Sequence, residues 1–296
     1  MLALSLTVCF PVLLSAIAKA EEDHESSTSA TSKTMPQAHV STATIKLPIV
    51  DGTDIRFARS YTGDGLSQTK VAQIVQDDQG FMWFGTQYGL NRFDGYNFKV
   101  FVHDPRNPNS LSGVFINALF KDRHGTLWVG CDQFLNKFDR KTERFTQYAV
   151  PSVYHISQDT TGVLWLATTF GLYELDPATG RIRRFSHDPT DPLSLSSNDV
   201  KSSGEDKTGR FWVTNSEGLD EFDRGTGKVK VHVPLRESSN SFYEDRFGVF
   251  WIFGNALAVF DRNTNTLTHY SFHERKPPGR ALTGVTAMLE DPNGTL

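Results

Sequence analysis

Short apolar runs recur along the chain, each beginning after a glycine-containing turn. The runs are three or four residues long, and none shows the 3.6-residue spacing of an amphipathic helix. Continuous apolar runs of this length are typical of strands covered on both faces. The pattern therefore predicts an all-β chain whose central strands lie near residues 81–84, 127–129, 164–166, 211–213 and 250–252.

One motif, Asp-x-x-Gly-x-x-Trp, contains the tryptophan of every run. Its copies stand about 42 residues apart, which is the period of a four-stranded propeller blade. Helical HEAT repeats have a similar period, but no segment carries a convincing helical pattern. We predict a β-propeller of four-stranded antiparallel blades. The motif residues are Asp77, Gly80, Trp83; Asp122, Gly125, Trp128; Asp159, Gly162, Trp165; Asp206, Gly209, Trp212; and Asp245, Gly248, Trp251.

A sixth copy begins at Asp291 and Gly294. We therefore expect about five and a half blades and an incomplete ring, as in a fragment of a longer array. The segment at 55–60 would ordinarily pair with the last blade and close the circle. Without closure, a blade edge would expose unpaired backbone groups. The isolated chain is then expected to be an open or strained arc that aggregates.

The motif has a sufficient mechanical explanation. An Asp carboxylate can accept a hydrogen bond from the backbone N–H two residues later, and Gly supplies the positive φ that a tight hairpin turn requires. Trp then fills the gap between adjacent twisted sheets. These residues are accordingly interpreted as scaffold and not as metal ligands or catalytic acids.

The N-terminal region predicts export. Residues 1–20 hold an apolar run followed by Ala18-Lys19-Ala20, the small-x-small pattern of a signal-peptidase site. No basic residue precedes the run, so an uncleaved membrane anchor is the alternative. Residues 21–54 are rich in Ser, Thr and Ala and are interpreted as a disordered spacer. Residues 55–296 form the predicted partial propeller.

Composition agrees with an exported all-β domain. The chain has 12% aromatic residues, 23 glycines and a net charge of −4. It lacks the clustered positive face of nucleic-acid binders, so no nucleic-acid partner is expected. Cys131 is the one cysteine outside the signal segment and is expected to pack as a small apolar residue.

Three strings are similar to the two-component regulator propeller repeat. They are Gly-Phe-Met-Trp-Phe-Gly-Thr at 80–86, Gly-Leu-Asn-Arg-Phe-Asp-Gly at 89–95, and His-Asp-Pro-x-x-Pro-x-Ser-Leu-Ser, which occurs at 103–112 and again at 187–196. The resemblance covers about residues 55–296. It implies the periplasmic sensor region of a bacterial membrane receptor whose output is a histidine kinase or a diguanylate cyclase. It also implies attachment to the inner membrane through a helix outside this chain, with dimerisation possible in the full-length receptor.

Strand direction places the turns after the Trp strands at one end of the blades, together with the connectors between blades. These turns are less repetitive than the Asp-x-x-Gly turns and combine amide, hydroxyl, carboxylate and aromatic groups. Such groups suit a small polyhydroxylated molecule or an oligosaccharide through hydrogen bonds and ring stacking. The candidate ligand-binding residues are Gln87, Tyr88, Asp132, Gln133, Thr169, Phe170, Asn215, Glu217 and Asn255.

Other chemistry receives less support from the sequence. The His-Asp-Pro segments lack convergent metal ligands and are interpreted as stiffened loops. No cofactor or metal is expected. A sensory, ligand-binding ectodomain is favoured, while a propeller enzyme acting on carbohydrate and a protein-docking scaffold stay open as alternatives. Carboxylate pairing for glycoside chemistry would require two acids about 5–10 Å apart.

Overall fold

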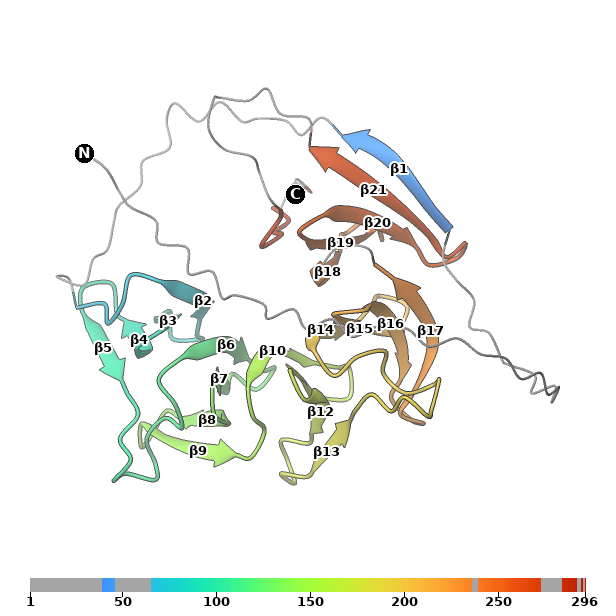
Figure 1. The fold of residues 1–296 in the computed structure, drawn as a ribbon. Helices are drawn as coiled ribbons and strands as arrows, with labels where there is room; N and C mark the ends of the chain where they lie inside the picture. Colours follow the sequence, from blue (N-terminus) through green and yellow to red (C-terminus); the bar gives the residue numbers. More distant parts are fainter. Residues whose placement is uncertain (1–38, 46–64, 236–238, 273–283, 292–293, 295) are drawn as a thin grey trace, which may run out of the picture. The chain divides into compact units, whose positions relative to one another are not determined.

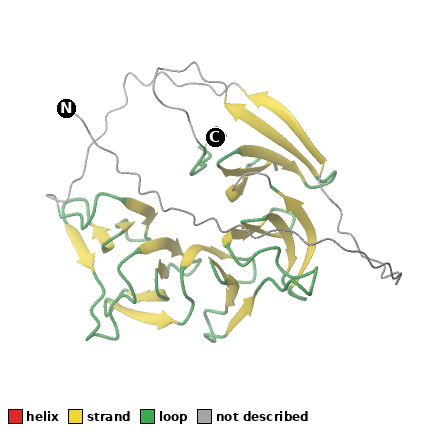
Figure 2. Cartoon of the chain, viewed as in Figure 1, coloured by secondary structure: helices red, strands yellow, loops and turns green. Residues whose placement is uncertain are grey.

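The computed structural model describes residues 39–45, 65–235, 239–272, 284–291, 294 and 296. Every helix or strand that it assigns within these residues is a strand (Figure 2). Among the described residues there is accordingly no helix that could cross a membrane. The all-β prediction is confirmed.

Twenty of the strands form five antiparallel four-stranded arrays, which we number as blades 1 to 5 (Figure 1). Blade 1 contains β2 (Val71–Gln76), β3 (Met82–Thr86), β4 (Gly89–Phe93) and β5 (Phe98–Phe101). Blade 2 contains β6 (Ile116–Lys121), β7 (Leu127–Cys131), β8 (Leu135–Asp139) and β9 (Arg144–Tyr148). Blade 3 contains β10 (Val153–Gln158), β11 (Leu164–Thr168), β12 (Gly171–Leu175) and β13 (Ile182–Phe185).

Blade 4 contains β14 (Val200–Glu205), β15 (Phe211–Asn215), β16 (Gly218–Asp223) and β17 (Lys228–Pro234). Blade 5 contains β18 (Ser239–Glu244), β19 (Phe250–Gly254), β20 (Leu257–Asp261) and β21 (Thr266–Phe272). In each blade, consecutive strands are neighbours in the sheet. This order is the one predicted from the repeat period.

An additional strand, β1 (His39–Ile45), joins blade 5 by pairing in parallel with β21. β1 thereby covers backbone groups that an edge strand would expose. It lies within residues 21–54, which the sequence assigned to a spacer. The predicted signal segment at 1–20 and the predicted closing strand at 55–60 lie outside the described residues.

The first strand of each blade lies against the first strand of the next, so that β2, β6, β10, β14 and β18 are successive neighbours. We call these the inner strands. Between consecutive blades, a tryptophan of one blade packs on apolar side chains of the following blade. The Trp83 and Phe138 rings, for example, meet edge to face with their centroids 5.0 Å apart. The prediction that the tryptophans fill the gap between adjacent sheets is confirmed. Within the described residues the sheets do not close into a ring.

Each inner strand is interrupted by a β-bulge after its first paired residue. A bulge leaves one residue unpaired and redirects its side chain. The unpaired residue is Tyr154 in blade 3 and Lys201 in blade 4. Because the bulge depends on register and not on composition, the apolar pattern of the sequence did not reveal it.

The strand order gives the blades two ends. At one end, which we call the turn face, the Asp-x-x-Gly turns join the first and second strands and further turns join the third and fourth. At the other end, the connector face, lie the turns between the second and third strands and the connectors 102–115, 149–152 and 186–199. The candidate ligand-binding residues belong to the connector face.

Candidate functional site

The motif aspartates organise the turn face. In every blade one carboxylate oxygen accepts hydrogen bonds from the backbone N–H groups two and four residues later. The second oxygen accepts the indole N–H of the motif tryptophan, for example Trp212 at 2.8 Å from Asp206. The motif glycines have positive φ, as in Gly80 at 89°. The predicted turn chemistry is confirmed, and the indole bond adds a reason for the Asp-to-Trp spacing that the sequence analysis missed.

The candidate ligand-binding residues occupy equivalent turns on the connector face. The Tyr88 and Phe170 rings stand at the same position in blades 1 and 3, where they are 59% and 48% exposed. The exposed Gln133 and Glu217 take this position in blades 2 and 4. Gln87 and Thr169 are half-buried, and Asp132 and Asn255 are exposed.

Backbone hydrogen bonds hold these turns against the connectors. The Gly89 N–H donates to the Val114 carbonyl at 2.8 Å, and the Gly171 N–H donates to the Asn198 carbonyl at 2.7 Å. Gly89 and Gly171 adopt positive φ, and the carbonyl oxygens of Phe101 and Phe185 lie close to where a Cβ would stand. A larger residue would therefore separate the turn from the end of the fourth strand. The connector face is thus a set of rigidly attached turns with exposed tips.

Asn215 differs from the other candidates because it is 2% exposed. Its side-chain oxygen accepts hydrogen bonds from the backbone N–H groups of Glu217 and Gly218, and its amide nitrogen donates to Asp220 at 2.9 Å. The structure therefore places Asn215 beneath the turn, where it shapes the backbone that presents Glu217.

A serine in the segment that precedes the first strand is held by a buried side chain of the third strand in three blades. This side chain is an Asn in blades 1 and 2 and an Asp in blade 4, and each is fully buried. The backbone N–H of the serine donates to its oxygen at 2.9 to 3.0 Å in the pairs Ser67 with Asn91, Ser112 with Asn136 and Ser196 with Asp220. Sequence reasoning missed these pairs, although the repeated Leu-Ser at the end of each long connector was a signal for them.

Asp220 is the one acidic member of this set. It accepts hydrogen bonds from the Ser196 hydroxyl at 2.8 Å and from the Asn215 amide. His232, on β17, lies with Nδ1 at 2.7 Å from the Asp220 carboxylate. A buried carboxylate requires such partners because an unpaired charge is costly away from water. Asp220 therefore ties the blade 4 connector to both the third and the fourth strand.

The two His-Asp-Pro segments are fastened internally. His103 Nδ1 donates to the Leu111 carbonyl at 2.6 Å, and His187 Nδ1 donates to the Leu195 carbonyl at 2.7 Å. These bonds fit the interpretation of the segments as stiffened loops. Among the described residues, no group of three or more His, Cys, Asp or Glu side chains could hold a metal ion.

A groove of about 450 Å³ runs along the inner strands of blades 1 to 4. Its lining includes Gln73, Tyr154, His155, Ser157 and Gln158. Tyr154 is 44% exposed and projects at the bulge of β10. Burial lowers the pKa of His155 from 6.5 to about 4, so the imidazole is neutral near pH 7. The groove thus offers hydrogen-bonding groups, among them the neutral His155 imidazole, together with the Tyr154 and Phe120 rings and the Glu205 carboxylate.

Cys131 ends the second strand of blade 2 and is fully buried. The Asn136 amide donates to its sulfur at 3.2 Å, and burial raises the pKa of the thiol to about 12. The thiol therefore stays protonated and packs as an apolar side chain, as the sequence indicated.

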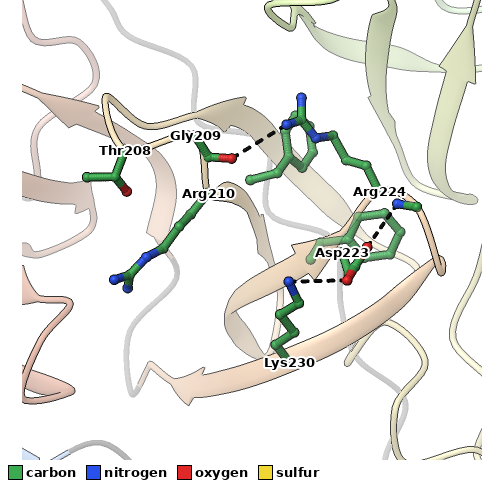
Figure 3. A pocket seen from close by; sticks show the side chains of 9 residues that line it. Thr208, Gly209, Arg210, Asp223, Arg224 and Lys230 are labelled. Atoms are coloured by element: carbon green, nitrogen blue, oxygen red, sulfur yellow. Dashed lines mark hydrogen bonds and ion pairs between the residues drawn. The ribbon is translucent and has the colours of Figure 1, made fainter.

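The turn face of blade 4 contains a pocket of about 290 Å³ (Figure 3). Arg224 lies along its wall and donates to the Gly209 carbonyl, while Lys230 pairs with Asp223 at 3.1 Å. Neither this pocket nor the inner-strand groove is lined by a candidate residue of the connector face. The candidates therefore do not form the wall of either cavity.

Comparison with known proteins confirms the resemblance found in the motifs. Residues 65–88 and 110–133 match the family described as Two component regulator propeller, so the chain carries repeats of this type. A stretch of 49 residues, 17% of this chain, is 49% identical to Histidine kinase P4 of Formosa agariphila and spans 4% of that protein.

Solved structures agree in fold. The extracellular domain of BT3049 from B. thetaiotaomicron, assigned to a hybrid two component system, matches with a TM-score of 0.64 and 28% identity. The match covers 71% of this chain and 31% of that one. A virginiamycin B lyase from Staphylococcus aureus matches with a TM-score of 0.53 and 13% identity, over 69% of this chain and 70% of that chain, which shows the fold alone.

Proposed function

We propose that this chain is the ligand-sensing propeller of a bacterial signalling receptor. It is exported to the periplasm, binds a small molecule or oligosaccharide on its connector face, and passes the signal across the inner membrane to a histidine kinase or diguanylate cyclase. The likeness to an extracellular receptor domain supports the export and the sensory role. In this proposal the chain itself is not an enzyme.

The observation that carries the ligand proposal is the repeated exposure of aromatic and polar tips at one position of successive blades. Tyr88 and Phe170 present rings in blades 1 and 3, while Gln133 and Glu217 present hydrogen-bonding groups in blades 2 and 4. Rings supply apolar contact area at low entropic cost, and amides and carboxylates fix orientation. An extended polyhydroxylated molecule could contact several tips at once.

The rigidity of the connector face supports a sensory role. The tips stand on turns whose backbone is bonded to the connectors, and the connectors are bonded to the buried Asn91, Asn136 and Asp220. A preorganised surface loses little conformational freedom when it binds. In the proposed receptor, residues 1–20 direct export, residues 21–54 act as a spacer in which β1 is paired with blade 5, and dimerisation occurs through the full-length protein.

The test is a thermal-shift and calorimetric screen of the chain against mono- and oligosaccharides. A ligand that binds the folded state alone increases the free energy of unfolding by mass action, by about 2.7 kcal/mol at one hundred times its Kd, and so raises the unfolding midpoint. Tyr88→Ala and Phe170→Ala should weaken binding. Phe247→Ala is the matched control, since Phe247 is 76% exposed but lies on the turn face.

Two outcomes would contradict the proposal. One is the absence of any thermal shift or heat of binding across a broad panel of saccharides and small molecules. The other is a ligand whose affinity falls equally in the Phe247 variant, which would move binding away from the connector face. Capture of a folded protein by the Tyr88 and Phe170 surface, without any small-molecule ligand, would instead identify a docking scaffold.

A further inference from the structure

Blade 2 has a pocket on its turn face at the same place as the blade 4 pocket of Figure 3. Both lie between the Asp-x-x-Gly turn and the turn that joins the third and fourth strands. The blade 2 pocket measures about 530 Å³, against about 290 Å³ in blade 4. Its lining includes His124, Lys137, Asp139, Arg140, Lys141 and Tyr148.

An arginine follows the Phe-Asp pair at the end of the third strand in blades 2, 4 and 5. In blade 4, Arg224 donates to the motif Asp159 of blade 3 at 3.0 Å and to Glu205 of its own blade at 2.9 Å. In blade 5, Arg262 makes the corresponding bonds to Asp206 and Glu244, both at 2.7 Å. The arginine therefore joins consecutive blades.

These two arginines are also stacked on aromatic rings. The Arg224 guanidinium lies 5.4 Å from the centre of the Phe211 ring, and that of Arg262 lies 5.2 Å from the Phe250 ring. Two charge-assisted hydrogen bonds and a ring face fix each guanidinium in position. In blades 4 and 5 this guanidinium could not turn towards a ligand without breaking the contact between blades.

Arg140, the equivalent residue of blade 2, lacks these contacts. Its Nη2 stands 3.9 Å from the motif Asp77 and 4.0 Å from Asp78, beyond hydrogen-bonding distance. Within the described part of the chain, its Nε and Nη2 atoms are buried without a hydrogen-bond partner. Leaving donors of a charged group unsatisfied in this way is costly, and an anion that reached them would remove this cost.

Two substitutions between blades explain the difference. Lys121 stands where blades 4 and 5 have Glu205 and Glu244, and its ammonium is bonded to Asp78 at 2.6 Å. Leu127 stands where they have a phenylalanine. Arg140 therefore has neither a carboxylate of its own blade to bond to nor an aromatic ring to stack on.

The charge of the blade 2 pocket is positive. Lys137 and Lys141 form no ion pair within the described residues, and the carboxylate of Asp139 accepts the backbone N–H groups of Lys141 and Thr142 in its own turn. These bonds lower the pKa of Asp139. Within the pocket lining, three cationic side chains therefore face one carboxylate that is already hydrogen-bonded. Outside the lining, Asp77 and Asp78 stand 3.9 and 4.0 Å from Arg140, and Asp78 is already paired with Lys121.

We propose that the blade 2 pocket is an oxyanion site in which Arg140 and Lys141 bind a phosphate, sulfate or carboxylate group. No hydrogen bond through Nε or Nη2 holds the Arg140 guanidinium, so it can turn into the pocket without losing one. A planar guanidinium beside an ammonium suits a two-oxygen contact with such a group. The site lies on the turn face and is independent of the sugar-binding surface proposed for the connector face.

The test titrates the chain with phosphate, sulfate and acetate at constant ionic strength set with chloride, followed by calorimetry and thermal unfolding. The expected result is saturable binding of at least one of these anions, with an affinity about tenfold or more lower in Arg140→Gln, as for removal of one charge-assisted pair. Preference for phosphate and sulfate would assign a tetrahedral anion, and preference for acetate a carboxylate.

The matched variant combines Asp78→Thr with Lys121→Glu, which copies the contact between Thr160 of blade 3 and Glu205 of blade 4. It leaves every residue of the pocket lining unchanged but should capture the Arg140 guanidinium and abolish anion binding. Arg224→Gln, in blade 4, should leave the anion response intact. The proposal is overturned if chloride gives the same response as the oxyanions, or if Arg140→Gln or the double variant binds them as tightly as the unchanged chain.

Discussion

Blade 4 and blade 2 share strand order, motif and bulge, yet they use the same arginine position differently. In blade 4, Arg224 bridges to the preceding blade at 3.0 Å, whereas in blade 2 the matching distance from Arg140 is 3.9 Å. The backbone does not decide this, since both residues follow Phe-Asp at the same turn. The role of a repeated residue depends on its partners, here Glu205 against Lys121.

Blade 5 extends the comparison to a more buried ion-pair cluster. The side chains of Arg262, Asp206 and Glu244 are 13%, 0% and 8% exposed. Burial would raise the pKa of Asp206, but hydrogen bonds from Thr208, Trp212 and Arg262 bring it below its ordinary value. An ion pair of this kind costs much when one partner alone is removed.

The largest expected effect is therefore the loss of Arg262. Arg262→Gln leaves two buried carboxylates without their cation and should lower the free energy of unfolding by about 3 kcal/mol. Arg140→Gln, at the equivalent position of blade 2, should change it by less than about 0.5 kcal/mol. Urea unfolding of both variants measures the difference, and equal losses would refute the contrast between the blades.

Unfolding at low pH tests the same Arg262–Asp206 ion pair independently. Because the folded-state pKa of Asp206 is lowered, its contribution is fully present above the unfolded value near 3.8 and is lost as the pH falls through the folded value. Arg262→Gln should reduce the loss of stability below about pH 4, while Arg140→Gln should not.

A second effect concerns the two kinds of connector anchor. Asp220→Asn places an amide where blades 1 and 2 already have Asn91 and Asn136, but it faces the amide nitrogen of Asn215 and loses the charge beside His232. We expect a loss of about 1–2 kcal/mol, typical of a buried donor left without an acceptor.

Adding Asn215→Thr to this variant copies Thr86 and Asn91 of blade 1 and should recover part of the loss. Chemical unfolding measures both variants. If the single variant is as stable as the unchanged chain, Asp220 is interchangeable with its Asn counterparts and the blade 4 anchor has no special role.

Much of the fold was predictable because its signals are local and repeated. Asp77, Gly80 and Trp83 have roles that follow from turn chemistry and ring size, and the same triplet returns in every blade. The Arg140, Arg224 and Arg262 positions were visible as a repeated Phe-Asp-Arg. Their partners lie in the preceding blade or about 20 residues earlier, so sequence alone did not connect them.

The candidate site was predictable in outline only. Strand direction placed the turns of Tyr88 and Phe170 on one face, as the structure shows. It did not separate the exposed Glu217 from the buried Asn215, because burial there depends on how Asn215 bonds to its own turn and to Asp220. The Tyr154 bulge was missed for a related reason, since register is set by pairing across strands.

A smaller effect distinguishes the inner groove from the turn face. His155 is held neutral with a pKa of about 4, below its ordinary value of 6.5. As the pH falls from about 6.5 towards 4, the unfolded chain binds a proton at this residue that the folded chain does not, so stability decreases. His155→Gln should make the decrease between pH 7 and 5 shallower, as measured by unfolding midpoints. An unchanged slope would mean that His155 takes up its proton in the folded state.

The smallest expected effect is a gain in stability from converting blade 2 into blade 4. Asp78→Thr with Lys121→Glu removes one exposed ion pair, which contributes little, and gives the Arg140 guanidinium a carboxylate of its own blade. The unfolding midpoint should rise slightly. The reverse change across blades 3 and 4, Thr160→Asp with Glu205→Lys, should lower it because Arg224 would lose its Glu205 partner. Opposite signs in the two blades would show that the arginine's surroundings set its role. If the midpoint falls in both variants, Leu127, which offers no ring to the guanidinium, prevents Arg140 from pairing with the introduced carboxylate.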